Sequence, residues 1–183
     1  MNLSLDPLWG RRTLVIGGVK SGKTRLACAF VEKVLAKREE RVTVLDFAPD
    51  LYRGVGGKMI LSDHPRLRYL TASITAPRLR GQNTAEVLSL AEGNRWRIET
   101  LLESYRAAPD PVLVINDATL YLHAGTAARL MEVAGAAATL LVNAYCGEDF
   151  REVFLSTRER EELEIFMTFF ERIVRMEGGR IVE

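Results

Sequence analysis

Residues 17–24 read Gly17-Gly18-Val19-Lys20-Ser21-Gly22-Lys23-Thr24, and this octapeptide matches the complete G-x-x-x-x-G-K-[ST] phosphate-binding pattern. In such a loop successive backbone N–H groups surround a pyrophosphate. The lysine, here Lys23, reaches the β- and γ-phosphates, and the hydroxyl of Thr24 ligates Mg²⁺. Glycines are needed because the loop takes positive φ values and leaves no room for a Cβ atom beside the phosphate.

The residues on both sides of the loop support this interpretation. The apolar run 12–16 is typical of a buried parallel strand. From Lys23 onward apolar residues recur at helical spacing, so the loop leads into a helix whose positive dipole end points at the bound anion. The predicted nucleotide-binding residues are Gly17, Gly18, Val19, Lys20, Ser21, Gly22, Lys23, Thr24 and the following Arg25.

The composition limits the class of protein. The chain has 183 residues, of which 48% are hydrophobic, and this predicts a single P-loop nucleotide-binding domain over 1–183, with 1–10 as an N-terminal extension. A net charge of +1 gives no reason to expect a nucleic-acid or acidic-membrane surface. Cys28 and Cys146 are far apart in sequence, which fits a reduced, cytoplasmic protein, and no apolar run is long enough for a signal peptide or a membrane span.

Strand and helix patterns alternate along the chain. The expected fold is therefore α/β: a three-layer sandwich with a mostly parallel central sheet, the P-loop NTPase fold, ending in a C-terminal antiparallel hairpin. We predict a surface loop over 73–82. The predicted strands are 12–16, 41–46, 67–71, 112–117, 138–143, 172–176 and 180–182, and the predicted helices begin at Lys23 and cover 84–107, 126–134 and 156–171.

A nucleotide-hydrolysing site needs a carboxylate at a neighbouring strand end, and two residues qualify. Asp117 ends the most apolar predicted strand, and Asp46 ends the second strand. We favour Asp117, because its strand is the more central, as catalytic residue and as Mg²⁺ ligand together with Thr24; Asp46 is the other catalytic candidate. Asn116 stands where many ATPases carry the metal-linked aspartate, and this predicts slow hydrolysis.

Several basic residues and two histidines are further candidates. Arg53 and Lys58 flank a glycine-rich segment that is suited to a mobile lid or switch. Other arginines flank the strand at 67–71: Arg66, Arg68, Arg78 and Arg80. In one interpretation these basic residues contact phosphates, or one of them is an arginine finger. In the other they are solvated surface charges. His64 and His123 are expected to be ordinary loop residues.

The loop also resembles that of a known family. Residues 17–24 are similar to the G-G-x-R-S-G-K-S loop of the adenosylcobinamide kinase / adenosylcobinamide-phosphate guanylyltransferase family, a RecA-like branch of the P-loop proteins. Lys20 stands where the family has arginine, and Thr24 where it has serine. Residues 143–147 correspond to a family strand that ends in a turn containing Asn and Gly. The resemblance implies nucleotide binding and phosphotransfer, with His64 in the place of the family's guanylylated histidine.

Together these features predict Mg²⁺-dependent binding of a nucleoside triphosphate, with hydrolysis or phosphoryl transfer to an unidentified acceptor. The expected nucleotide is ATP, with GTP as the alternative, and the sequence lacks an N-K-x-D-type guanine motif. The alternatives are a nucleotide-dependent switch or assembly protein with slow hydrolysis, read by a protein partner, and a binding module that has lost activity. The apolar face of helix 156–171 is expected to pack against the sheet, and an exposed part of it would be a homo-oligomer contact.

Overall fold

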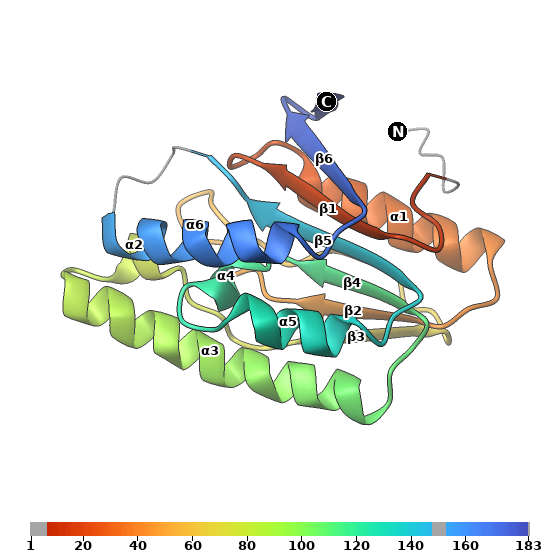
Figure 1. Ribbon diagram of the computed structural model, residues 1–183, viewed down its shortest axis with the longest axis horizontal. Coiled ribbons are helices and arrows are strands. Elements are labelled where there is room, and N and C mark those ends of the chain that lie inside the picture. Colours follow the sequence, from red (N-terminus) through yellow and green to blue (C-terminus); the bar gives the residue numbers. More distant parts are fainter. Residues whose placement is uncertain (1–6, 148–152, 183) are drawn as a thin grey trace.

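The computed structural model describes residues 7–147 and 153–182, and within them one seven-stranded sheet has the order β3-β2-β4-β5-β1-β6-β7 (Figure 1). All neighbouring strands run parallel except β7, which pairs antiparallel with β6. The strands are β1 (Arg12–Gly17), β2 (Val42–Asp46), β3 (Leu67–Thr71), β4 (Val112–Asn116), β5 (Thr139–Tyr145), β6 (Arg172–Glu177) and β7 (Arg180–Val182).

Helices cover both faces of the sheet, so the molecule has three layers (Figure 1). Helix α1 covers one face, and α3, α5 and α6 lie over the other. Short helices α2 and α4 follow the carboxyl ends of β3 and β4. The bounds are α1 (Lys23–Lys37), α2 (Pro77–Arg80), α3 (Thr84–Ala107), α4 (Thr119–Leu122), α5 (Ala127–Ala134) and α6 (Val153–Met167). No helix in the described ranges has the length and apolar character that crossing a bilayer requires.

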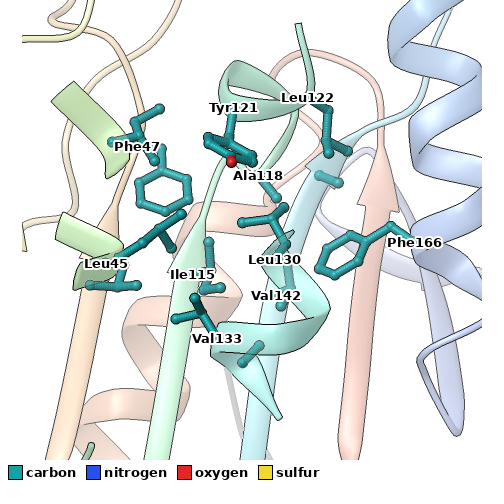
Figure 2. Packing of buried hydrophobic residues seen from close by; sticks show 14 of the residues in the cluster. Leu45, Phe47, Ile115, Ala118, Tyr121, Leu122, Leu130, Val133, Val142 and Phe166 are labelled. Carbon is teal, nitrogen blue, oxygen red and sulfur yellow. The ribbon is translucent and has the colours of Figure 1, made fainter. Parts of the chain in front are cut away.

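Successive residues of each inner strand enter opposite cores. In β4, Val114 packs on the α1 side and Ile115 on the side of α3, α5 and α6. This alternation is the period of two that a strand imposes, with both faces apolar because both are covered. Figure 2 shows Ile115 and Val142 of neighbouring strands beneath Leu130 of α5, with Phe166 of α6 beside them.

The predicted α/β class, the parallel sheet and the C-terminal hairpin are confirmed. Helix α3 has the predicted bounds, and the side chain of Asn83 caps it by accepting a hydrogen bond from the backbone N–H of Glu86. Strand β4 ends one residue earlier than predicted, since Asp117 leaves the strand with a φ of 61°. Residues 1–6 of the predicted N-terminal extension lie outside the described ranges, whereas Leu8 is buried against the α1 side of the core.

The prediction of a surface loop over 73–82 is wrong. This stretch contains α2, and Ile74 is only 2% exposed. Pro77 occupies the first helical turn, where its missing N–H costs nothing and its fixed φ suits the helix. Residues 77–80 carry no helical pattern because a single turn is too short to show a 3.6-residue period. Helix α4, also one turn long, was missed for the same reason.

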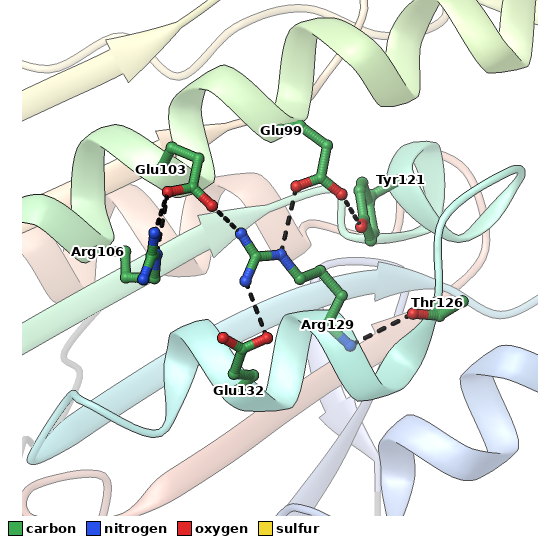
Figure 3. Close-up of polar contacts among 7 residues, drawn as sticks. All are labelled: Glu99, Glu103, Arg106, Tyr121, Thr126, Arg129 and Glu132. Carbon is green, nitrogen blue, oxygen red and sulfur yellow. Dashed lines mark hydrogen bonds and ion pairs between the residues drawn. The ribbon is translucent and has the colours of Figure 1, made fainter.

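Helix α5 is fastened to α3 by one arginine (Figure 3). Arg129 pairs with Glu99 at 3.3 Å, with Glu132 at 2.8 Å and also with Glu103. Glu99 additionally accepts a hydrogen bond from the Tyr121 hydroxyl. These contacts hold α3, α4 and α5 together over one face of the sheet.

Candidate functional site

The glycine-rich loop lies between β1 and α1, at the carboxyl end of the sheet. Lys20 has a φ of 58° and Gly22 a φ of 98°, so the backbone turns twice through the left-handed region. A Cβ atom on Gly17 would lie 2.4 Å from the carbonyl oxygen of Met176, which explains why this position requires glycine. Consecutive N–H groups in such a turn form a concave anion site.

The lysine of the loop is held by the loop itself. Nζ of Lys23 donates to the carbonyl oxygens of Gly17 at 2.8 Å and Gly18 at 2.7 Å. Helix α1 begins here without a side-chain cap and without an acidic residue in its first turn, among the described residues. The ammonium group and the first N–H groups of the helix are therefore positioned to meet one anion.

The C-terminal hairpin supports the loop from behind. The N–H of Gly179 donates to the carbonyl oxygen of Ser21 at 3.0 Å, and the guanidinium of Arg25 donates to the Gly179 carbonyl oxygen at 3.4 Å. A Cβ atom on Gly22 would lie 3.0 Å from Cα of Gly179. Arg25, predicted to bind nucleotide, thus contacts the hairpin turn as well as lining the pocket described below.

A chain of hydrogen bonds links α1 to three neighbouring strand ends. The Thr24 hydroxyl donates to Oδ1 of Asn116 at 3.3 Å, and Nδ2 of Asn143 donates to the same oxygen at 2.6 Å. Asn116 in turn donates to Oδ1 of Asp46 at 2.7 Å. The strands carrying Asp46, Asn116 and Asn143 are adjacent, and this adjacency brings residues far apart in the sequence into one buried network.

Asp46 is fully buried and accepts hydrogen bonds on both oxygens. Besides Asn116, its donors are the N–H of Ala48 at 3.0 Å, the N–H of Met59 at 2.6 Å and the hydroxyl of Tyr69. Burial, together with the Asp46 carboxyl, raises the pKa of Tyr69 well above its usual value. Asp46 does not line the pocket, and its predicted catalytic role stays a prediction.

Asp117 has a different environment. Its N–H donates to Oδ1 of Asn143 at 2.7 Å, and its Oδ1 accepts from the Thr119 hydroxyl at 2.8 Å. Burial raises the pKa of its carboxyl, against the opposing effects of Thr119 and the Lys23 ammonium. Its side chain lines the pocket together with the residues of the loop.

A pocket of about 300 Å³ opens above the loop, at the lower end of the range for small-molecule sites. Its floor is formed by residues 19–25 and its walls by four further segments. The wall residues include Pro49, Gly54, Gly57, Arg78, Leu79, Asp117, His123, Asn143 and Tyr145. Of the predicted site residues, Val19 to Arg25 and Asp117 therefore come together, while Gly17 and Gly18 hold Lys23 from below.

The second glycine-rich segment, residues 53–58, forms one side of this pocket. Tyr52 and Val55 exchange two backbone hydrogen bonds of 3.0 Å, with Arg53 and Gly54 at the tip in the left-handed region. Nζ of Lys58 donates to the carbonyl oxygens of Ala48 and Ala72, and burial lowers the pKa of Lys58. Lys58 thus ties the segment to two strand ends and does not line the pocket.

The arginines and histidines lie at both ends of the strands. Arg66 donates to the Leu35 carbonyl oxygen at the end of α1, and Arg68 lies near the start of β2 and β4. Both lie near the amino ends of the strands, on the side opposite the phosphate-binding loop. His64 lines a separate hollow, whereas His123, expected to be an ordinary loop residue, is buried in the pocket wall.

No family model matches the sequence, and a search of the curated proteins finds no match. Among solved structures, the flagellar accessory protein FlaH from Methanocaldococcus jannaschii is similar at 13% identity with a TM-score of 0.49. The similarity covers 94% of this chain and 75% of that chain. A similarity of this size does not identify the function of the site. The roles of its residues are inferred from their distances and contacts in this structure.

Proposed function

We propose that this chain binds a nucleoside triphosphate, ATP rather than GTP, with Mg²⁺, and hydrolyses it or transfers its terminal phosphoryl group. The observation that carries the proposal is the position of Lys23. Its ammonium lies inside a loop of left-handed turns, at the start of a helix whose first N–H groups face the same pocket. In this function Lys23 exchanges the carbonyl oxygens of Gly17 and Gly18 for phosphate oxygens.

The residues around Thr24 suit a magnesium ion. Mg²⁺ prefers oxygen ligands, and the Thr24 hydroxyl lies 3.3 Å from the amide oxygen of Asn116, with the Asp117 carboxyl in the same pocket. When bound, the ion neutralises charge on the β- and γ-phosphates. Asp117 then orients a water molecule or an acceptor hydroxyl, and Asp46 holds Asn116 in place.

One observation favours the second candidate, a switch or assembly protein with slow hydrolysis. Asn116 offers an amide where a carboxylate would assist the metal, and both ends of this amide already have partners in Asp46, Asn143 and Thr24. A neutral group at this point gives less stabilisation of the developing charge. In this alternative, bound nucleotide reorders the segment around Gly54, and a protein partner recognises the change.

The deciding experiment measures phosphate release from ATP and from GTP, each with Mg²⁺, for wild type and Lys23→Ala. We expect wild-type turnover that Lys23→Ala lowers by about 100-fold or more, because the ammonium is lost where charge develops. Lys37→Ala, at the far end of the same helix, is the matched control and should keep wild-type turnover.

Two other outcomes are informative. Tight binding without turnover, weakened by Lys23→Ala, would favour the switch. If Lys23→Ala retained wild-type affinity for both nucleotides, the proposed site would be wrong.

A further inference from the structure

Three charged or titratable side chains from separate segments of the chain meet beside the pocket. Oε2 of Glu159, on α6, accepts from Nη2 of Arg78 on α2 at 2.5 Å and lies 2.9 Å from Nε2 of His123, just after α4. The three side chains are 7%, 8% and 4% exposed, respectively. This cluster is therefore almost completely withdrawn from solvent.

The hydrogen-bonding pattern leaves a ring nitrogen of His123 available. A carboxylate only accepts, so Nε2 of His123 carries the proton shared with Glu159. The other ring nitrogen, Nδ1, is buried and has no hydrogen-bond partner among the residues that the structure describes. A buried polar atom of this kind is uncommon in native structures and points to a ligand or another absent partner.

Stability alone does not account for such a cluster. Buried ion pairs are weak contributors to folding, because removing the charges from water offsets most of their attraction. Arg78 and His123 both line the pocket whose floor is formed by the phosphate-binding loop. A buried cation, and an imidazole nitrogen that becomes a donor when the ring takes up a second proton, suit an anion that enters the pocket.

We infer that Arg78 and His123 form an anion subsite for a phosphoryl group, with Glu159 orienting both side chains. The inference rests on the proposed function and adds a second contact point to it. The phosphoryl group is either the terminal phosphate of the bound nucleotide or a phosphate carried by the acceptor. Both have the same chemistry: oxygens that accept hydrogen bonds from the guanidinium of Arg78 and from Nδ1 of His123, whose ring carries a second proton when the anion is bound.

A neighbouring arginine supplies the contrast. Arg80 lies on the same short helix as Arg78, but it is exposed and stacks over the ring of Tyr52, at 4.5 Å from the ring centroid. It does not line the pocket. Arg80→Gln is therefore a control that changes the charge of α2 by the same amount as Arg78→Gln without touching the subsite.

The test measures dissociation constants by calorimetry for MgATP, for MgADP, and for inorganic phosphate added to the MgADP complex. The variants are Arg78→Gln, His123→Gln, Glu159→Gln, Lys23→Ala and the control Arg80→Gln. If the subsite takes the terminal phosphate, Arg78→Gln and His123→Gln weaken MgATP about tenfold and leave MgADP unchanged. If it takes an acceptor phosphate, they weaken inorganic phosphate by a similar factor and leave both nucleotides unchanged.

Glu159→Gln separates a binding role from a structural one. It removes the negative charge that competes for Arg78 while keeping a hydrogen-bond acceptor. The dissociation constant of the ligand that occupies the subsite therefore falls severalfold. MgADP reports on the intact loop in the same preparation, so a variant that fails to fold loses all ligands together. His123→Gln, which alters the cluster least, then carries the test.

Two results would overturn the inference in distinguishable ways. In the first, every subsite variant binds MgATP, MgADP and phosphate as tightly as Arg80→Gln does, while Lys23→Ala loses nucleotide binding. This result would reject the subsite and leave the proposed function standing. A wild-type protein that binds neither nucleotide would reject both.

Discussion

At the scale of single residues, the informative pair is Asp46 and Asp117. Both follow apolar strands, so the sequence pattern alone left either as the catalytic carboxylate. Their surroundings separate them: Asp46 receives four hydrogen bonds in the core, whereas Asp117 lines the pocket with a raised pKa. The difference comes from donors such as Tyr69 and Met59, and no local spacing in the sequence predicts that they reach Asp46.

Asp117→Asn is expected to stabilise the nucleotide-free protein while lowering turnover. Burial raises the folded-state pKa of this carboxyl above its unfolded value of about 3.9, so the ionised form opposes folding. This cost is absent below the unfolded pKa and complete above the folded pKa. Asparagine tolerates the φ of 61° and keeps an acceptor for Thr119.

The check on Asp117→Asn is its melting temperature relative to wild type at about pH 4 and about pH 8. The variant should gain at the higher pH and lose most of that gain at the lower one. A variant that is less stable than wild type at both values would contradict this account.

Asp46→Asn should give the opposite result, a loss of stability. The amide NH₂ of asparagine would replace one of the carboxyl oxygens that now accept these hydrogen bonds. One or two of the donors would then lack an acceptor, which costs about 2–5 kcal/mol in total. Urea unfolding measures this loss, with the exposed Asp63→Asn as control. Unchanged stability together with lost turnover would instead indicate that Asp46 acts directly in catalysis.

At the scale of helices and strands, local patterns predicted the strands and the longer helices but not the one-turn helices α2 and α4. Helix α3 and strand β3 have their predicted bounds because each carries its own cap or periodicity. Helix α2 depends on tertiary packing instead: a Cβ atom on Gly81, at its end, would lie 2.4 Å from Cγ2 of Val87 on α3. Such an approach between segments leaves no periodic signal in the sequence.

The contact between α3 and α5 yields a prediction at this scale. Arg129→Met removes the cation shared by Glu99, Glu103 and Glu132, and we expect a loss of about 1–2 kcal/mol in unfolding free energy, smaller at high salt. Its control is Arg106→Met, which removes one exposed pair with Glu103 and should cost clearly less. Chemical denaturation at low and high salt distinguishes them, and equal losses would argue against the network.

At the scale of the whole molecule, sheet order decides what the sequence could reveal. Residues 17–24 are contiguous, so their motif is readable, and Asp117 follows from its place at a strand end. Arg78 lies on α2, Glu159 on α6 and His123 just after α4, and they meet only because these segments pack around the same pocket. No spacing rule connects them, and therefore the subsite became visible only in the structure.

The same architecture predicts that nucleotide stabilises the entire domain. The loop touches β1, α1 and the terminal hairpin, and its network reaches β2, β4 and β5, so a ligand bound there joins most of the sheet. A ligand at about 100 times its Kd adds about 2.7 kcal/mol. For a domain of this size, that raises the melting temperature by about 5–10 °C.

The measurement is thermal unfolding against MgATP and MgGTP concentration, with Lys23→Ala as control. A wild-type shift that grows with nucleotide concentration and is absent in Lys23→Ala would tie the stabilisation to the loop, and the nucleotide with the larger shift would identify the preferred base. An equal shift in Lys23→Ala would place the binding elsewhere, because this substitution removes the ammonium held by Gly17 and Gly18 and leaves the rest of the surface unchanged.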